Sequence, residues 1–379
     1  MLDRFSPRGG GSEQWSFGFA RFLAGQGHEV HVVAFDADED HGLKLTLHRL
    51  PHAADPIRRA RRAARVIDAL RPDAVHDTGT GWSADVFHPL TGSRPLAQER
   101  LAALHPPLLG PRAAWSPLSV LRRQRMAQLE RRQLRDATRI VAVSRMVAGH
   151  LAARFGVADD RMQVIHNGVD VARFASSRLD PLRLETREML HAIGTTLYLI
   201  SAHDLRLQGV DTALRALARV RASGADVRAV VAGGAAGPDW LELAGSLGVR
   251  RRVAFLGEVG DMPRLYAAAD VLVHATRWDA CSLSTLEAGA AGLPVITTAM
   301  DGAAELIGDG RTGFVLPDPG DVVALADRMT RLLDPDLRLR IGDAARAAAP
   351  AHDNVRNYKA VAAVLREAAR ERRAEARRR

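Results

Sequence analysis

The chain of 379 residues is too long for one ordinary domain and is suited to two. Hydrophobic residues make up 47% of it and charged residues 26%, which excludes an intrinsically disordered protein. The net charge of +9 suits a phosphorylated substrate, an anionic membrane or a nucleic acid as partner.

Features that are absent from the sequence exclude several further classes of protein. No apolar run approaches the roughly 20 residues that a membrane-spanning helix needs. The first residues lack the apolar core of a signal peptide, so we expect a cytoplasmic protein. The single cysteine, Cys281, excludes an internal disulfide and a multi-cysteine metal site. Because only 5% of the residues are aromatic and they do not alternate with basic ones, we expect no nucleic-acid partner.

The first half of the chain alternates helix and strand signals. We expect helices over residues 12–26 and 58–70 and from residue 144, and strands over 29–35 and 139–143 and from residue 73. This alternation predicts a parallel sheet covered by helices on both faces. Only eight residues precede Gly9, Gly10 and Gly11, which open the first helix, while a strand usually has about five or six residues. We therefore expect the first strand to be mostly missing.

A second alternating series follows a turn-rich break at residues 165–174 and a polar stretch that extends to about residue 196. Strands are expected over 197–202, 227–232, 253–256, 271–274 and 294–298, with helices that include 210–221 and 284–291. The sequence thus predicts an α/β protein of two doubly wound, Rossmann-like domains, over residues 1–170 and 190–350, with the ligand in the cleft between them.

The stretch RWDACSLSTLEAGAAGLPVITT, residues 277–298, carries the most chemical information. It sets Asp279 and Glu287 eight residues apart, across a turn that opens a helix. Ser282 and Ser284 are suited to cap that helix. Its free backbone amides and positive dipole end would suit a diphosphate, and the two acids could hold sugar hydroxyls. Either acid alone would be read as a solvated charge at a helix end, but the flanking pattern favours a binding site.

This stretch resembles the acid-x7-acid signature of the retaining glycosyltransferases of family 4, and more narrowly its variant in relatives of the lipopolysaccharide core glucosyltransferase. Four other segments agree in the same order along the chain: SPRGGGSEQW with the first Gly-rich loop of the family, HNGVD with its interdomain turn, HDLRLQGVDTALRAL with its cationic loop and helix, and DGAAELIGDGRTGFVLPDPGD with its C-terminal helix and turn.

The resemblance implies the GT-B fold, with an acceptor-side domain at 1–170, a nucleotide-sugar donor domain at 190–350, and a helix at 351–379 that crosses back to the first domain and ends in a basic tail. It implies sugar transfer from a nucleoside diphosphate sugar with retention of configuration, without a metal or any other cofactor. The residues that it marks as catalytic are His88, Arg206 and Asp279. Those that it marks as donor-binding are Gly10, Gly11, Arg206, Gln208, Asp279, Ser282, Leu283, Ser284 and Glu287.

Two positions depart from the family pattern. Gln208 stands where the family usually has a lysine, so one charge near the leaving diphosphate is lost. Leu90 stands where a related segment has a second histidine, and His88 remains, either to face the reacting sugar or as a structural residue. Arg206, on a loop beyond a strand, is the expected phosphate clamp, because a guanidinium fits phosphate oxygens.

A basic segment, residues 94–135, has nine arginines and two acids. It includes an expected helix that begins near Pro117, with apolar residues between the arginines. Such a helix suits an anionic membrane surface, and it equally suits packing on its own domain. Because the family uses lipid-linked acceptors, we expect a peripheral position on the inner face of the plasma membrane.

We therefore expect a retaining glycosyltransferase that moves a sugar to a glycan or lipid-linked acceptor in cell-envelope polysaccharide or lipopolysaccharide synthesis. Three alternatives stay open: a catalytically degenerate protein that binds a nucleotide or glycan without turnover, an epimerase on the same architecture, and a basic nucleic-acid-binding module.

Overall fold

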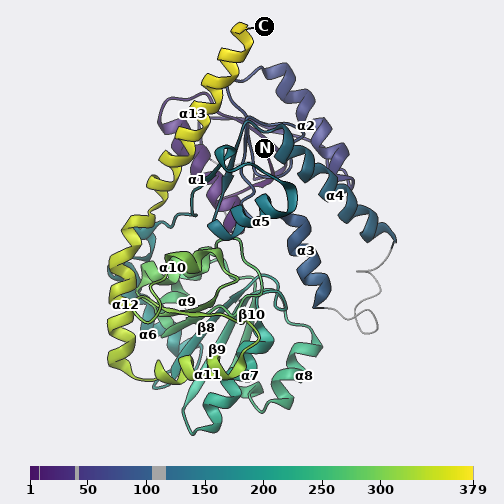
Figure 1. Ribbon diagram of the computed structural model, residues 1–379. Helices are drawn as coiled ribbons and strands as arrows, with labels where there is room; N and C mark the ends of the chain where they lie inside the picture. The colour runs from purple at the N-terminus through teal and green to yellow at the C-terminus, as the bar shows by residue number, and fades with distance from the viewer. Residues whose placement is uncertain (8, 39–41, 105–116, 379) are drawn as a thin grey trace. The chain divides into compact units, whose positions relative to one another are not determined.

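The computed structural model describes residues 1–7, 9–38, 42–104 and 117–378. The chain divides into two compact units, one made of Met1–His166 with Val355–Arg379 and the other of Asn167–Asn354 (Figure 1). The first unit is discontinuous in sequence, because its last helix follows the whole of the second unit. None of the helices in the described part of the chain has the length and apolar content that crossing a membrane requires.

The first unit contains two parallel sheets. Their strand orders are β1-β2-β3 and β4-β5-β6-β7. The strands are β1 (Leu2–Phe5), β2 (His31–Ala37), β3 (Thr46–Arg49), β4 (His76–Asp77), β5 (Val86–Phe87), β6 (Arg139–Ala142) and β7 (Met162–Val164). The helices are α1 (Gly11–Gly25), α2 (Pro56–Leu70), α3 (Arg94–Ala103), α4 (Pro117–Asp136), α5 (Arg145–Phe155) and α13 (Asn354–Arg378).

A short first strand is present, and here the structure differs from the expectation that it is mostly missing. β1 pairs in parallel with β2, with Leu2 opposite Ala34. Phe5 is completely buried at its end. Four residues are enough for this strand because the neighbouring β2 supplies a ready hydrogen-bonding edge, so strand length alone was a poor guide.

Helix α13 lies against α1 (Figure 1). The Trp15 indole donates a 2.7 Å hydrogen bond to Asn357 Oδ1, and its ring packs edge-on against Tyr358. A Cβ atom on Gly18 would lie 2.1 Å from the Tyr358 hydroxyl oxygen, so only glycine fits where the two helices meet. These contacts fix the end of the chain to its beginning within the first unit.

The second unit is built on one six-stranded parallel sheet with the order β10-β9-β8-β11-β12-β13. Its strands are β8 (Thr196–Ala202), β9 (Val227–Gly233), β10 (Val253–Gly257), β11 (Val271–Val273), β12 (Val295–Thr298) and β13 (Phe314–Leu316). Its helices are α6 (Ser176–Met189), α7 (Val210–Ala222), α8 (Pro238–Ser246), α9 (Met262–Ala268), α10 (Leu283–Ala291), α11 (Val322–Arg331) and α12 (Pro335–Ala348). The strand order reverses between β8 and β11, and ligands of such sheets bind beyond the carboxyl ends of the strands at this point.

The polar stretch after residue 174 forms a helix, α6, that the sequence analysis did not predict. Its residues are mostly polar and Pro181 lies inside it, so the usual helical pattern of apolar residues is weak. The helix is held by ion pairs instead: Arg183 and Arg187 both contact Asp270, at 2.6 and 3.0 Å. Burial acts to raise the pKa of Asp270, but the hydrogen bond from the Leu197 amide and the charges of the two arginines outweigh it and lower that pKa.

The chain enters and leaves the second unit at neighbouring points. Val169 forms a parallel bridge with Asp353. The Val169 amide donates to the His352 carbonyl oxygen at 2.9 Å, and the Asn354 amide donates to the Val169 carbonyl oxygen at 3.0 Å. The two connecting segments are therefore paired with each other.

Candidate active site

Two loops meet at the point where the strand order of the second unit reverses. One follows β8 and contains residues 203–209; the other follows β11 and contains residues 274–282. Arg277 joins them: its amide donates to the Leu207 carbonyl oxygen at 2.8 Å and its guanidinium to the Arg206 carbonyl oxygen at 2.6 Å. The same guanidinium binds Asp211 through both carboxylate oxygens, at 2.8 and 2.9 Å. This fork fixes the loop after β8 before any ligand arrives.

Asp279 lies on the loop after β11, and its carboxylate receives two polar contacts. His274 Nε2 lies 3.3 Å and Gln208 Nε2 lies 3.5 Å from Asp279 Oδ2. The His274 ring is fully buried, whereas the Asp279 side chain keeps 23% of its exposure. Burial lowers the pKa of His274, but the hydrogen bond to Asp279 and the charge of Asp301 outweigh it and leave that pKa raised. The carboxylate is thus oriented by a partner that favours its charged form.

Asp301 accepts hydrogen bonds from residues at the start of α10. The sequence analysis did not identify this residue. It is 1% exposed, and its Oδ1 accepts hydrogen bonds from the Ser282 and Ala303 amides at 3.0 and 2.9 Å. Its Oδ2 accepts from the Thr285 and Thr297 hydroxyls at 2.8 and 2.9 Å. An aspartate followed by Gly302 reads only as a turn in the sequence, because its four partners come from three separate segments.

The N-terminus of α10 presents unused backbone donors. Ser282 is the cap residue, and its hydroxyl oxygen accepts from the Thr285 amide at 3.2 Å. The amides of Leu283 and Ser284 have no hydrogen-bond partner in the described part of the chain. The Ser284 hydroxyl lies 2.8 Å from that of Ser201, at the end of β8. Free amides at a helix N-terminus favour an anion.

Glu287 lies one turn into α10. Its Oε2 accepts a 2.9 Å hydrogen bond from the hydroxyl of Tyr266, a residue of α9. Burial raises the pKa of Glu287 to about 7, although the Tyr266 hydrogen bond and the charge of Arg173 oppose that shift. The carboxyl therefore changes charge near neutral pH unless a ligand supplies further hydrogen bonds.

The two residues expected to face the diphosphate are held differently. The Arg206 side chain is 44% exposed, forms a 2.8 Å ion pair with Asp239, and lies over the Trp240 ring. Gln208 is drawn into the loop instead: its Oε1 accepts from the Asp204 amide at 3.0 Å while its Nε2 faces Asp279. The structure thus brings Gln208 to Asp279, and it holds the Arg206 guanidinium against α8.

The other expected residues, Gly10, Gly11 and His88, belong to the first unit. Gly10 precedes α1 and caps it through its carbonyl oxygen, which accepts from the Gln14 amide at 3.0 Å. His88 is completely buried, 3.2 Å from His76 and edge-on to the Trp15 ring. Burial lowers its pKa to about 3, so the imidazole is neutral. These surroundings are those of a packed histidine, and its catalytic role stays a prediction.

Two family models match the chain. The model described as Glycosyltransferase Family 4 matches residues 9–173, and the one described as Glycosyl transferases group 1 matches residues 194–335. The chain belongs to glycosyltransferase family 4. The membership predicted from the motifs is therefore confirmed, and the second model includes both acids of the signature.

Curated relatives of this family-4 chain carry different names. It is 34% identical over 245 residues to a D-inositol 3-phosphate glycosyltransferase of Salinispora tropica, a match that covers 60% of this chain and 49% of the relative. It is 30% identical over 271 residues to a glycogen synthase of Mycobacterium tuberculosis, which covers 70% of this chain and 61% of that protein. The chain thus spans about half the length of the first of these relatives and more of the second.

Solved structures share the fold. WaaG, a glycosyltransferase involved in lipopolysaccharide biosynthesis, matches 96% of this chain and 99% of its own with a TM-score of 0.78 and 23% identity. HepE of Anabaena, solved with UDP-glucose, matches 97% of this chain and 100% of its own with a TM-score of 0.67 and 20% identity. The predicted GT-B fold of two Rossmann-like domains is confirmed.

Proposed function

We propose that the protein transfers a sugar, with retention of configuration, from a nucleoside diphosphate sugar to a glycan or lipid-linked acceptor in cell-envelope polysaccharide or lipopolysaccharide synthesis. Family membership supports sugar transfer, and the fold is shared with HepE, which was solved with UDP and with UDP-glucose. The shared fold with WaaG, which acts in lipopolysaccharide biosynthesis, supports an envelope role.

The free amides of Leu283 and Ser284 carry the donor assignment. They lie at the N-terminus of α10, between Asp279 and Glu287, beyond the carboxyl ends of the central strands. A diphosphate placed there would receive backbone hydrogen bonds and the positive end of the helix dipole, while the two acids would hold sugar and ribose hydroxyls. Such donors stabilise the charge that develops on the leaving diphosphate.

The same arrangement supports catalysis without a metal. Arg206 would turn from Asp239 toward the phosphates, and Gln208 would donate a neutral hydrogen bond where the family has a lysine. Gly10 and Gly11 of the first unit are proposed to bind the donor, because their segment resembles the first Gly-rich loop of the family. The leaving phosphate itself would take the proton of the acceptor hydroxyl.

The basic segment supports a place at the inner face of the plasma membrane. Two leucines of α4, Leu118 and Leu121, are 79% and 46% exposed. Next to this helix lies a cavity of about 640 Å³ whose lining includes five arginines and Trp82. Its arginines are Arg131, Arg132, Arg135, Arg154 and Arg161. A helix with exposed apolar side chains near its start and a concentration of positive charge near its end suits anionic lipid headgroups.

The second candidate is a protein that binds a nucleotide sugar without turnover, and the neutral amide of Gln208 beside Asp279 favours it. A thermal-shift screen with UDP, GDP, ADP and dTDP sugars tests the donor assignment, because a true donor stabilises the fold by mass action. We expect at least one nucleotide sugar to raise the melting temperature. Donor hydrolysis then separates the candidates: slow release of free sugar supports the enzyme, and binding without release supports the degenerate protein. No shift with any of these donors would contradict both.

A further inference from the structure

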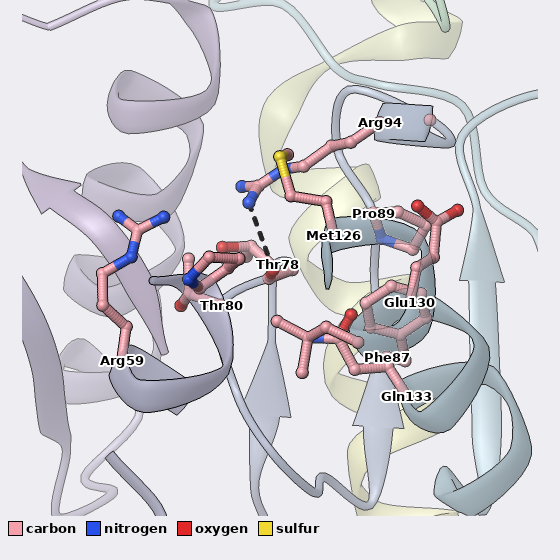
Figure 2. Close-up of a pocket in the computed structure, with 13 residues that line it drawn as sticks. Arg59, Thr78, Thr80, Phe87, Pro89, Arg94, Met126, Glu130 and Gln133 are labelled. Atoms are coloured by element: carbon pink, nitrogen blue, oxygen red, sulfur yellow. Dashed lines mark hydrogen bonds between the residues drawn. The ribbon is translucent and has the colours of Figure 1, made fainter. Parts of the chain in front are cut away.

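Thr78, directly after β4, borders two cavities of the first unit. Figure 2 shows it beside the smaller one, whose free space of about 20 Å³ holds no more than a water molecule. The larger cavity measures about 650 Å³ and extends from Thr78 along the segments that lead into β4 and β2. We call it the inter-sheet groove, because these segments belong to different sheets of the first unit.

The two long sides of the inter-sheet groove are backbone edges without a neighbouring strand. One side is formed by residues 28–33 and the other by residues 71–76. β2 pairs with β3 from His31 onward, but with β1 only from Ala34 onward. Among the strands that the structure describes, β4 has only β5 beside it. The backbone N–H and C=O of Ala74 have no hydrogen-bond partner in the same part of the chain. Both sides are therefore able to pair with one further strand.

Met1 lies at one end of the groove and bonds to β4 as a strand residue would. Its nitrogen donates to the His76 carbonyl oxygen at 2.7 Å, and its carbonyl oxygen accepts from the Thr78 amide at 3.1 Å. In a parallel ladder, one residue bonds in this way to the two residues on either side of its partner. Removal from water lowers the pKa of the Met1 amino group, although the charge of Asp77 opposes that shift. A peptide nitrogen at this position would make the same hydrogen bond without a charge to desolvate.

Both faces of the inter-sheet groove are covered by helices. Successive residues of β2 pack on opposite sides, Val32 with Ala20 of α1 and Val33 with Ala63 of α2. Helix α13 adds to the α1 side, because it lies against α1 (Figure 1). The apolar side chains that line the groove include Trp15, Phe19, Leu23, Ile67, Leu70 and Leu365. A parallel strand that is buried on both faces is a continuous apolar run, so an apolar segment suits these walls.

We propose that the inter-sheet groove is a strand site, which binds one extended apolar segment that runs parallel to β2 and β4 and continues β1 from the Met1 nitrogen. Because Leu2 is opposite Ala34, about four residues of this segment would lie opposite positions 29–32, at about 3.3 Å per residue. Its backbone would bond to Ala74 on one side and to the β2 edge on the other. The two sheets of the first unit would then form one continuous parallel sheet. The strand site is independent of the sugar transfer proposed above, since no donor or acceptor takes part in it.

The full chain with an initiator methionine and the sequence Ile-Val-Ala-Val placed before Met1 tests the proposal. This sequence repeats residues 140–143, the buried strand β6 and the residue after it. We expect the melting temperature to rise by about 4–8 °C, because apolar side chains leave water and unused backbone groups gain partners. Hydrogen exchange, followed by mass spectrometry, should slow roughly tenfold or more in peptides that contain residues 29–35 and 73–78. Peptides from β9 (Val227–Gly233), in the second unit, should exchange as before.

The matched control replaces the added sequence by Ile-Pro-Ala-Pro, which has the same length and stays apolar. Each proline removes a backbone N–H that the ladder with β2 needs, so this chain should melt and exchange as the wild type does. A second arm adds the blocked peptide Ile-Val-Ala-Val to the unextended chain, and we expect less stabilisation than from the joined segment. Equal melting temperatures of the wild type and the Ile-Val-Ala-Val chain, or an equal rise with both added sequences, would overturn the strand site. Stabilisation by the free peptide alone would overturn the continuation of β1.

Discussion

The phenol of Tyr266, a residue of α9, donates a 2.9 Å hydrogen bond to Oε2 of Glu287, one of the two acids of the candidate donor site. The Tyr266 ring is itself held edge-on by Phe174, with ring centroids 5.5 Å apart. One carboxylate oxygen of Glu287 is therefore fixed by the protein.

Glu287→Ala should weaken nucleotide-sugar binding more than tenfold while the fold survives, because a lost charged hydrogen bond costs about 1.5–3 kcal/mol. Tyr266→Phe keeps the Glu287 carboxylate but removes the hydrogen bond that fixes it, so the loss of nucleotide-sugar affinity should be smaller. Calorimetric titration measures both, with the melting temperature as the check on folding. Unchanged affinity in Glu287→Ala would remove Glu287 from the donor site.

Gln208→Lys should raise kcat by roughly ten- to a hundredfold, if an ammonium beside the leaving diphosphate contributes ~1.4–2.8 kcal/mol. The structure favours a gain, because Gln208 already faces Asp279, so the ammonium of a lysine at this position would lie beside a carboxylate. Steady-state kinetics with one confirmed donor measure the change. If neither the wild type nor Gln208→Lys shows turnover, the protein has lost catalysis. If the wild type turns over as fast as its relatives, Gln208 does not slow the reaction.

Asp301→Asn should lower both the stability and the donor affinity. An amide has one acceptor oxygen where the carboxylate has two, so hydrogen bonds to Ser282 and Ala303 or to Thr285 and Thr297 are lost. We expect a loss of about 1–3 kcal/mol in the free energy of unfolding, measured in urea. Asp343→Asn, on the exposed surface of α12, makes the same chemical change and should be neutral. Full stability in Asp301→Asn would show that the four bonds contribute little.

The titration of Glu130 should make the free energy of unfolding depend on pH. Burial raises the pKa of this carboxyl from 4.5 to about 7. Between these values the folded state binds more protons than the unfolded state, so this contribution is lost as pH rises from about 4.5 to 7. The free energy of unfolding of the wild type minus that of Glu130→Gln, measured in urea, should therefore fall by about 2–3 kcal/mol between pH 5 and 8. Glu242→Gln, on the exposed surface of α8, is the control. A difference that does not change with pH would contradict the buried, protonated carboxyl.

Vesicle flotation tests the membrane surface. At low salt we expect more protein with anionic than with neutral vesicles, and less as salt rises, because exposed charges are screened over ~8–10 Å at physiological ionic strength. Leu118→Glu with Leu121→Glu should reduce recovery, since both side chains are exposed on α4. Equal recovery with the two kinds of vesicle would contradict membrane docking.

Most of the fold could be predicted from the sequence because its strands are short apolar runs bounded by turns. The strand expected at 227–232 is β9 (Val227–Gly233), and the helix expected at 210–221 is α7 (Val210–Ala222). Helix α6 could not be predicted in this way, because its stability comes from two arginines on Asp270, a residue far along the chain.

The site divides in the same manner. Asp279, Glu287 and Ser282 could be identified because their spacing along one segment reflects one helix N-terminus. His274, Tyr266 and Asp301 could not, because their roles depend on partners that only the folded sheet brings near. The motif predicted that Arg206 binds the phosphates. It did not indicate that Asp239, on the following βα unit, forms an ion pair with the same guanidinium.

The pairing of Val169 with Asp353 has a consequence for synthesis on the ribosome. The second unit is an insertion between the body of the first unit and its last helix, so it emerges complete while the first unit still lacks α13. Until then, the α1 face of Trp15, Phe19 and Phe22 has no Tyr358 to cover it. The nascent N-terminal part therefore lacks the aromatic partner that α13 supplies until the second unit has been synthesised.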